Sequence, residues 1–336
     1  MLGIEPRLRT LETPYNSAVH VLTPPPVFPV NWISHPSVYQ QSIHFNSSLI
    51  RTSISNALQQ LDMKSPIVIN AFNPFFGLPL VGSFGEKLNL YYCYDEISAA
   101  GWTNKHGKEV EQKFMQRVHG VVTTSEALQS AKKQYNPNCF VVKNGVDFES
   151  FYRAADAKGK QDRKTIGYIG SIDERFDIET MRHAVQHLPE AKFVFTGRVV
   201  NQAAKDALTG FSNVEFHNPR KANEIPEVLR AIDVGIIPYL KNELTQGVYP
   251  LKINEYLAAG KAVVMTDFAH LPEFSQTVCF AGCKQTFAEG LREALATDSA
   301  EKKKERIEIA RKNSWENRVE ELSDVIEKLL DGKNAN

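Results

Sequence analysis

The feature of this sequence that most constrains its fold is a repeated alternation of short apolar runs with segments of helical period. Each apolar run of the first half ends in turn-forming or polar residues, as buried strands do. These runs are SPIVINAF (65–72), LNLYYCYD (88–95), GVVTTS (120–125) and NCFVVKNG (138–145). The segments between them, EVEQKFMQRV (109–118) and SEALQSAKKQY (125–135), have helical period, and Ser125 is suited to cap the second. Alternating strands and helices predict a parallel sheet.

The same alternation starts again after the polar segment 147–164, which we interpret as an interdomain linker. Its predicted strands are KTIGYIGS, KFVFTGR, VEFHNP, VGIIPY and AVVMTD, with helices IETMRHAVQHL, EIPEVLRAI and LKINEYLAAG between them. A chain of 336 residues exceeds the size at which one core keeps growing. We therefore predict an α/β protein of two Rossmann-like, doubly wound domains at 1–150 and 151–313, with a C-terminal amphipathic helix (314–336) that packs back on the first.

Composition narrows the class of partner. Lys and Arg balance Asp and Glu at 39 each, whereas a nucleic-acid binder normally carries a basic field over one domain. The four cysteines lack histidine companions, so neither a zinc site nor a disulfide framework is expected, and reduced thiols fit a cytoplasmic protein. No run of about 18 apolar residues and no basic-then-apolar leader occurs. We expect small-molecule or protein partners and no nucleic acid.

The segment PLKINEYLAAGKAVV (250–264) places a lysine and a glutamate in the first turns of a short helix that follows a predicted strand. Such helix starts lie beyond the carboxyl ends of α/β sheets and bind anions. Pro250 suits the first helical position, and Gly260 suits the end of the helix. Lys252 then adds charge for a diphosphate, and Glu255 accepts two hydrogen bonds from ribose hydroxyls. The alternative is an ordinary surface ion pair at i,i+3.

The segment GYIGSIDERFD (167–177) follows the first strand of the same domain. Gly167 and Gly170 permit close approach of the backbone to a ligand, and Arg175 offers a bidentate fork to phosphate oxygens. The alternative is a tight strand-to-helix connection. No G-x-G-x-x-G with a downstream acid appears, which argues against a dinucleotide dehydrogenase.

These blocks, with VEFHNPRKANEIPEVLRAIDVGIIPY and NGVDFESF, resemble GT-B glycosyltransferases in or near glycosyltransferase family 4. The similarity is to the subset for bacterial cell-surface polysaccharides, including teichuronic-acid-type enzymes. It spans roughly residues 88–330 and is most specific around Glu255. The resemblance implies two domains that face a cleft, with a nucleotide-sugar donor held by the second.

The resemblance also implies the donor-site residues. Glu255 matches the ribose-binding glutamate, Lys252 and Arg175 match the diphosphate-binding pair, and residues 216–220 match the loop that contacts the base. The expected donor-binding set is Gly170, Arg175, His217, Asn218, Tyr249, Leu251, Lys252 and Glu255. Lys252, Arg175 and the helix N-terminus would stabilise the departing diphosphate, and the sequence has no Asp-x-Asp pair to hold a metal. Neither a metal nor a cofactor is expected, because the nucleotide sugar is a substrate.

The sequence departs from the family pattern in two places. Gly247 stands eight positions before Glu255, where many relatives carry a second glutamate that contacts the donor sugar, so the retaining mechanism linked to that pair is in doubt. At the front, relatives open with a full strand and a loop that lines the acceptor site. Here we expect either an abbreviated first strand or a truncated start.

For inversion, a base must take the acceptor proton. We predict Asp95, at the end of LNLYYCYD, where it resembles the strand-end acid of inverting relatives, with Glu96 as second choice. The alternative is that Asp95 caps the segment EISAAGW. With Arg175 and Lys252, these two acids complete the predicted catalytic set.

The predicted function is hexosyl transfer from a nucleotide sugar, UDP-linked by family-level expectation, to a hydroxyl of a saccharide or lipid-linked acceptor in surface-polysaccharide synthesis. A nucleotide-sugar 2-epimerase of the same fold and a noncatalytic nucleotide-sugar-binding protein are the alternatives. Segment 22–39 is either an acceptor-binding loop or a loop packed against the sheet. The apolar segment 73–84 is either buried or a peripheral contact at the inner face of the membrane, with burial favoured.

Overall fold

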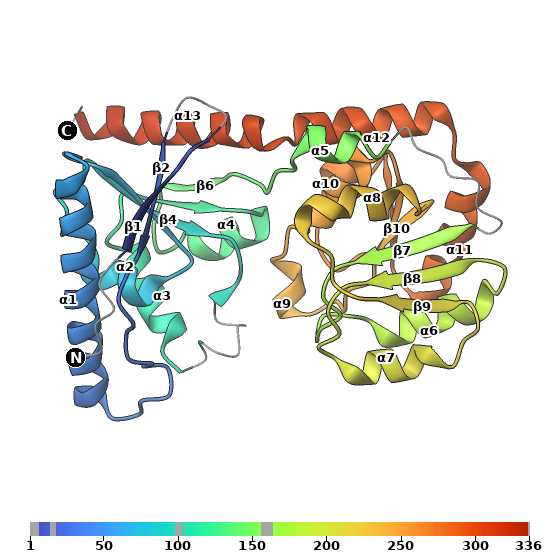
Figure 1. The fold of residues 1–336 in the computed structure, drawn as a ribbon, viewed down its shortest axis with the longest axis horizontal. Coiled ribbons are helices and arrows are strands. Elements are labelled where there is room, and N and C mark those ends of the chain that lie inside the picture. The colour runs from blue at the N-terminus through green and yellow to red at the C-terminus, as the bar shows by residue number, and fades with distance from the viewer. Residues whose placement is uncertain (1–6, 14–17, 98–102, 104, 156–163, 335–336) are drawn as a thin grey trace. The chain divides into compact units, whose positions relative to one another are not determined.

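The computed structural model describes residues 7–13, 18–97, 103, 105–155 and 164–334 of the chain. It divides into two compact units: residues 1–141 with 324–336, and residues 142–323. Figure 1 shows both units as ribbons.

The first unit is built on a four-stranded parallel sheet whose strands stand in chain order, β3-β4-β5-β6. Its elements are β1 (Arg7–Leu11), β2 (Val19–Thr23), α1 (Pro36–Gln60), β3 (Ile67–Ala71), α2 (Pro74–Leu80), β4 (Leu88–Cys93), α3 (Gly107–Met115), β5 (Gly120–Thr123), α4 (Glu126–Lys132) and β6 (Cys139–Val141). The four apolar runs predicted to be strands are β3 to β6, and β1 and β2 form a separate antiparallel pair. The Ser125 hydroxyl accepts the Leu128 N–H at 3.2 Å, which confirms the predicted cap of α4.

The long helix α1 has no counterpart among the elements predicted from sequence. Its buried residues are mostly small or polar, including Asn46, Ser47, Ser53 and Ala57, so the sequence carries no apolar stripe at helical period. Pro36 occupies its first turn, where a missing N–H needs no partner.

The last helix, α13 (Trp315–Asn334), supplies its final turns to the first unit from residue 324 onward. Leu329 is buried in a cluster with Leu88 and Leu90 of β4. Gly120 makes room for it, since a Cβ at that position would lie 2.7 Å from Leu329 Cδ1.

The second unit has a six-stranded parallel sheet in the order β12-β11-β10-β7-β8-β9. Its elements are α5 (Phe148–Tyr152), β7 (Thr165–Ile169), α6 (Ile178–His187), β8 (Lys192–Thr196), α7 (Gln202–Thr209), β9 (Val214–His217), α8 (Ile225–Arg230), β10 (Val234–Ile237), α9 (Glu243–Gln246), α10 (Leu251–Ala258), β11 (Ala262–Thr266), β12 (Val278–Ala281), α11 (Lys284–Thr297) and α12 (Ala300–Lys312). The chain runs outward from β7 to β9 and then returns to β10 on the other side of β7. The strand order therefore reverses between β7 and β10, and ligands of doubly wound sheets bind at such switch points.

The start of the second unit differs from the sequence-based boundary at residue 150. Residues 142–150 belong to the second unit, and the predicted linker begins with the short helix α5. Phe148 and Phe151 are buried in the core of that unit, and the Asp147 carboxylate caps the helix by accepting the Ser150 N–H at 3.2 Å. The two buried phenylalanines thus anchor the start of segment 147–164, although the overall polarity of that segment is typical of a linker.

Candidate functional site

The side chains after β7 and β10 meet at the switch point of the second unit. Tyr239 follows β10, Gly170 follows β7, and Lys252 reaches both from the first turn of α10. Lys252 Nζ donates a hydrogen bond to the Tyr239 hydroxyl at 3.0 Å and lies 5.5 Å from the centre of the Tyr168 ring. The lysine is thus held against two buried aromatic rings.

Gly170 is required by the path of that lysine. Its φ is +141°, and a Cβ at this position would lie 2.4 Å from Lys252 Cε. At the end of β8, Gly197 has a φ of +151°, and a Cβ there would lie 2.0 Å from the Gly170 carbonyl oxygen. The ends of β7 and β8 can come this close, with Lys252 beside them, only because both residues are glycine.

Gly167 has a different role from the one expected. It lies inside β7, and its missing side chain leaves the space that Ile232 fills, because a Cβ would lie 2.1 Å from Ile232 Cδ1. This glycine serves core packing, and Gly170 is the one that lies at the site.

Arg175 is held beside the same cluster by Asp173. Arg175 Nε lies 2.9 Å from Asp173 Oδ1 and Nη2 lies 2.6 Å from Oδ2, a two-pronged pair. The guanidinium carbon lies 5.1 Å from the centre of the Tyr239 ring. Although burial opposes it, the hydrogen bonds from Arg175 hold the pKa of Asp173 below its ordinary value. Arg175 and Lys252 therefore flank one aromatic ring.

The charges of Lys252 and Arg175 both lower the pKa of Tyr239. Burial works against ionisation of its phenol, yet the charges of Lys252 and Arg175 together bring the pKa of Tyr239 below its ordinary value. Sequence reasoning missed Tyr239, Asp173 and Gly197. Their signals in the sequence were their positions: Tyr239 is the second residue after β10, Asp173 stands two residues before Arg175, and Gly197 comes directly after β8.

Helix α10 is fixed to the sheet at its core side. The Tyr256 hydroxyl accepts the Ile169 N–H at 3.0 Å, and Ile253 and Leu257 are fully buried. Gly260, with a φ of +69°, closes the helix in a Schellman motif in which its N–H bonds to the Leu257 carbonyl. The helix begins at Leu251, so Pro250 is its N-cap rather than its first residue, a shift of one position.

Glu255 is a half-buried carboxylate one turn along from Lys252. Burial raises the pKa of Glu255, while the charge of Lys252 works in the opposite direction. Within the described part of the chain, its carboxylate has no hydrogen-bond or ion-pair partner, and Lys252 bonds to Tyr239 instead. The interpretation of these two residues as an ordinary surface ion pair is therefore wrong.

The remaining predicted donor-site residues fall into two groups. Leu251 is exposed at the start of α10, and His217 and Asn218 are exposed at the end of β9, where the His217 carbonyl accepts the Gly197 N–H at 3.1 Å. Tyr249 is buried instead, and its hydroxyl accepts a hydrogen bond from Asn254 at 3.2 Å. Its side chain packs the core, so the structure gives no support to a donor contact through that side chain.

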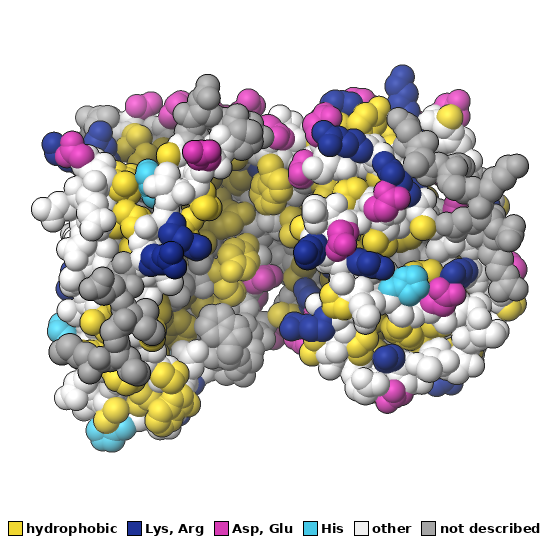
Figure 2. Space-filling view, viewed as in Figure 1, with side chains coloured by type: hydrophobic (Ala, Val, Ile, Leu, Met, Phe, Trp, Pro, Cys, Tyr) yellow, Lys and Arg dark blue, Asp and Glu magenta, His cyan; other side chains and the backbone are white. Residues whose placement is uncertain are grey.

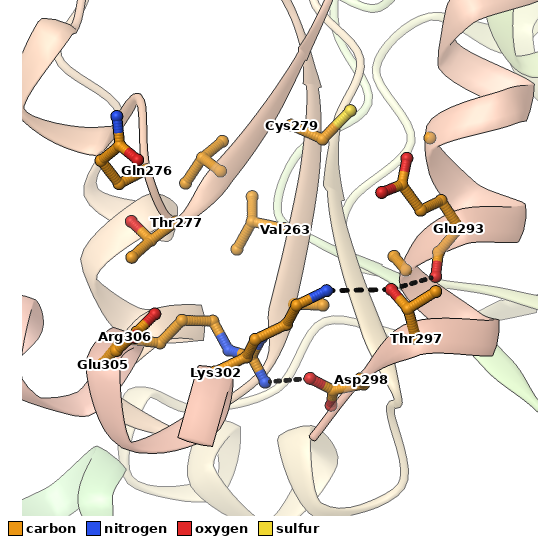
Figure 3. A pocket seen from close by; sticks show the side chains of 14 residues that line it. Val263, Gln276, Thr277, Cys279, Glu293, Thr297, Asp298, Lys302, Glu305 and Arg306 are labelled. Carbon is orange, nitrogen blue, oxygen red and sulfur yellow. Dashed lines mark hydrogen bonds and ion pairs between the residues drawn. The ribbon is translucent and has the colours of Figure 1, made fainter. Parts of the chain in front are cut away.

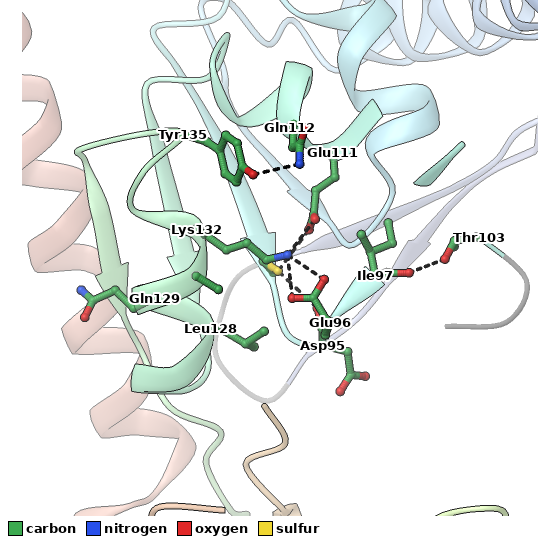
Figure 4. Close-up of polar contacts among 12 residues, drawn as sticks. Asp95, Glu96, Ile97, Thr103, Glu111, Gln112, Leu128, Gln129, Lys132 and Tyr135 are labelled. Carbon is green, nitrogen blue, oxygen red and sulfur yellow. Dashed lines mark hydrogen bonds and ion pairs between the residues drawn. The ribbon is translucent and has the colours of Figure 1, made fainter. Parts of the chain in front are cut away.

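The two predicted acids of the first unit have different surroundings, as Figure 4 shows. Glu96 points toward Lys132, whose amino group lies 2.9 Å from the Glu96 carboxylate and 2.8 Å from that of Glu111. The Tyr91 hydroxyl donates a further bond to Glu111 at 2.9 Å. Glu96 thus belongs to a largely buried ion cluster that ties the segment after β4 to α3 and α4.

Asp95 is half-buried, and its carboxylate points away from Lys132. Its backbone carbonyl accepts a hydrogen bond from the Cys93 thiol at 3.3 Å. The alternative role for Asp95, capping the segment EISAAGW, concerns residues 96–102, of which 98–102 lie outside the described residues. Of the two acids, Asp95 is the one whose carboxylate is directed away from the ion cluster.

A pocket of about 250 Å³ in the second unit lies elsewhere. Figure 3 shows it between the starts of β11 and β12 and the helices α11 and α12, at the amino ends of the strands. In this pocket the Arg306 guanidinium forms an ion pair with the Asp298 carboxylate at 2.7 Å and donates a hydrogen bond to the Gly260 carbonyl. This pocket is separate from the Lys252 site, which lies at the carboxyl ends.

Comparison with known proteins identifies the second unit. Residues 163–297 match the family model described as glycosyl transferases group 1. Over these residues the second unit is similar to a group 1 glycosyltransferase domain. This domain contains Gly170, Arg175, Lys252 and Glu255, and the match confirms the resemblance inferred from these blocks.

A curated relative supports the same group. The chain is 30% identical over 214 residues to TuaH of Bacillus subtilis (strain 168), which is named as a teichuronic acid biosynthesis glycosyltransferase. The match covers 57% of this chain and 54% of TuaH, so the chain spans about half the length of the curated relative it matches.

Solved structures share the fold. The sucrose-phosphate synthase of Thermosynechococcus elongatus has a TM-score of 0.71 at 15% identity, over 96% of this chain and 86% of that one. A UDP-forming trehalose-phosphate synthase of Burkholderia xenovorans with glucose-6-phosphate scores 0.70 at 12% identity, over 96% and 89%. The Escherichia coli trehalose-6-phosphate protein bound to UDP-2-fluoro glucose scores 0.69 at 12% identity, over 95% and 89%. These likenesses confirm the predicted α/β GT-B fold.

None of the described helices combines the length and the apolar composition that crossing a membrane requires. The apolar segment 73–84 is mostly α2, and Pro74, Phe75, Gly77 and Leu80 are buried there. Burial, the favoured interpretation of this segment, therefore holds for those residues.

Proposed function

We propose that the protein transfers a sugar from a nucleotide-sugar donor to a hydroxyl of a saccharide or lipid-linked acceptor in the synthesis of a cell-surface polysaccharide. The observation that carries the proposal is the convergence of Lys252 and Arg175 on the Tyr239 ring at the switch point. Two fixed cations beside a helix N-terminus fit a diphosphate, and Glu255 on the same helix offers an unpartnered carboxylate for ribose hydroxyls.

The proposed chemistry follows from charge. When the bond between the sugar carbon and the diphosphate oxygen breaks, negative charge develops on the diphosphate, and Lys252, Arg175 and the first N–H groups of α10 stabilise it. The acceptor oxygen bonds to the sugar carbon and loses its proton. For an inverting transfer we assign that proton to Asp95.

The donor is proposed to carry UDP. Support comes from solved structures of the same fold, which include UDP-forming synthases and a protein bound to UDP-2-fluoro glucose. The proposal places the reaction in the cytoplasm, at the inner face of the membrane when the acceptor is lipid-linked. No metal or cofactor is assigned, because the two cations supply the charge.

A test separates this function from its alternatives. The protein is incubated with UDP-sugars, with and without saccharide and lipid-linked acceptors, and UDP release and sugar products are measured. Transfer predicts UDP release that rises with acceptor. A 2-epimerase would convert the donor with no acceptor present, and a noncatalytic binding protein would leave every donor intact.

A further inference from the structure

A row of exposed apolar side chains marks one surface of the first unit. Phe28 is 62% exposed, Trp32 72%, Val38 48% and Phe45 49%, and we name these four the apolar ridge. The Phe28 and Phe45 ring centres are 5.6 Å apart, and Val38 and Phe45 stand seven residues apart on one face of α1. Figure 2 shows hydrophobic side chains gathered at the lower edge of this unit, where Figure 1 places the loop before α1.

The ridge is held in place by buried groups beneath it. The Asn46 side chain is fully buried and makes two bonds to Phe28, accepting its N–H at 3.0 Å and donating to its carbonyl at 2.8 Å. Val30 and Ile33 turn inward and form a buried cluster with Tyr39. The loop therefore packs on α1, whereas one interpretation of segment 22–39 had it packed against the sheet, and Phe28 and Trp32 are presented to solvent.

A second set of contacts supports Trp32. The Lys105 amino group donates to the Trp32 carbonyl at 3.3 Å and also bonds to the Ser34 hydroxyl. The His106 ring stacks on Tyr39 with centres 4.0 Å apart, and its Nε2 lies 2.9 Å from the Ile33 carbonyl oxygen. Holding large apolar side chains in water is unfavourable, so a surface built this way needs a partner.

Charge indicates which partner. No Asp or Glu occurs from residue 13 to residue 61, although the chain has 39 acids. Exposed Lys105 contacts this stretch at the Trp32 carbonyl, and exposed Lys108 follows three residues later in the chain. The nearby Glu109 carboxylate forms an ion pair with the Lys113 amino group at 2.6 Å, which balances its charge.

We propose that the apolar ridge binds the surface of an anionic lipid bilayer. Tryptophan and phenylalanine favour the membrane–water interface, and basic groups beside them are attracted to anionic headgroups. A saccharide subsite would combine its aromatic rings with carboxylates that accept sugar hydroxyls, and the ridge carries none. A second copy would bring the same basic groups face to face.

The inference refines the membrane contact of the proposed function and identifies its surface. It favours a lipid-linked acceptor, because the loop under the ridge contacts Lys105 and His106, which lie ten and eleven residues after Asp95 in the chain. Vesicle binding needs no sugar transfer, so the two proposals can fail separately.

The test measures sedimentation of the full chain with phosphatidylcholine vesicles that contain phosphatidylglycerol. The double variant Trp32→Ser/Phe45→Ser is expected to bind vesicles at least about tenfold more weakly, since two interfacial aromatic groups are lost. Met63→Ser, which removes a half-exposed side chain just after the far end of α1, is the matched control and should bind like the wild type. Circular dichroism and UDP calorimetry verify that the double variant is folded.

The wild-type protein should bind more weakly to pure phosphatidylcholine vesicles, and more weakly to the anionic vesicles at high salt. Both results would support an electrostatic contribution from the basic groups beside the ridge. Three results would overturn the proposal: no vesicle binding by the wild type, equal binding by the double variant, or a wild-type dimer in sedimentation that the double variant abolishes. Sugar-transfer activity with intact kinetics but no vesicle binding would reject this surface while leaving the proposed function standing.

Discussion

The amino group of Lys252 donates a hydrogen bond to the hydroxyl of Tyr239 across 3.0 Å, in a cluster that also contains Arg175. Two cations so close together repel each other, and burial would add to that cost. The Tyr239 ring face and hydroxyl and the Asp173 carboxylate offset it, since each gives a cation a negative or electron-rich partner. The cluster is thus organised to receive an anion between its two positive charges.

Lys252→Met should weaken binding of UDP by about 1.5–3 kcal/mol, roughly ten- to 150-fold, because a hydrogen bond to a charged group is lost while the side-chain stem remains. Isothermal titration calorimetry with UDP measures the change. Uridine lacks the diphosphate, so its affinity should stay as in the wild type. The exposed Lys304 of α12 provides the matched control as Lys304→Met. An unchanged affinity of Lys252→Met for UDP would rule out the diphosphate role.

Donor affinity should fall as the pH is lowered through the pKa of Glu255, which is raised above its ordinary value. Burial raises the pKa of Glu255, and protonation removes an acceptor for the ribose hydroxyls. Calorimetry with a UDP-sugar avoids a terminal phosphate that titrates in the same range. Glu255→Gln should bind more weakly by about 1–3 kcal/mol at neutral pH and show a flatter pH profile. A profile as steep as that of the wild type would contradict the assignment.

Ionisation of Glu255, which favours donor binding, should lower the stability of the fold. A carboxyl group whose folded pKa is raised binds more protons in the native state than in the unfolded state, so its contribution to stability falls as pH rises through that window. Glu255→Gln is therefore expected to leave the melting temperature at neutral pH unchanged or higher. Loss of affinity without loss of stability distinguishes a binding residue from a packing residue.

Lys132→Met should destabilise the first unit by about 3–5 kcal/mol, because Glu111 and Glu96 lose the cation that neutralises them. Urea denaturation measures the loss. Burial already raises the pKa of Glu111 in the wild type, so the deficit should shrink at acidic pH, where the carboxyl groups take up protons. The double variant Lys132→Met/Glu111→Gln should recover part of the stability. A deficit that is independent of pH would point to lost packing rather than lost charge.

The candidate donor site could be located from the sequence because its signals are local. The elements β7, β10 and α10 begin within a residue or two of their predicted starts. The two strands are continuous apolar runs, and α10 is followed by Gly260. Gly170, Arg175, Lys252 and Glu255 were all predicted as site residues from short motifs. The pairing of Lys252 with Tyr239, rather than with Glu255, depends on tertiary packing and could not be read from the spacing of two residues on one helix.

The first unit was harder to predict for the same reason. Glu96 looked like a second candidate base, yet its partner Lys132 is 36 residues away and meets it only through the packing of α4. Helix α1 was missed because Asn46 and Ser47 occupy buried positions where a pattern search expects apolar side chains. Polar residues buried for a tertiary partner, such as Asn46 under Phe28, carry no periodic signal in the sequence.

Asp95→Asn and Glu96→Gln together test the assignment of the base. Asp95→Asn should lower the rate of transfer by about 10²–10⁴-fold, the usual contribution of a positioned general base, with an unchanged donor dissociation constant. Glu96→Gln keeps a hydrogen-bond acceptor for Lys132 but removes one of the two charges that balance it. It should therefore lower the melting temperature, with a smaller loss of rate than Asp95→Asn. The reverse pattern, a stable but inactive Glu96→Gln beside an active Asp95→Asn, would transfer the catalytic role to Glu96. Equal and small rate losses in both would exclude a carboxylate base from this strand end, because neither acid could then be removing the acceptor proton.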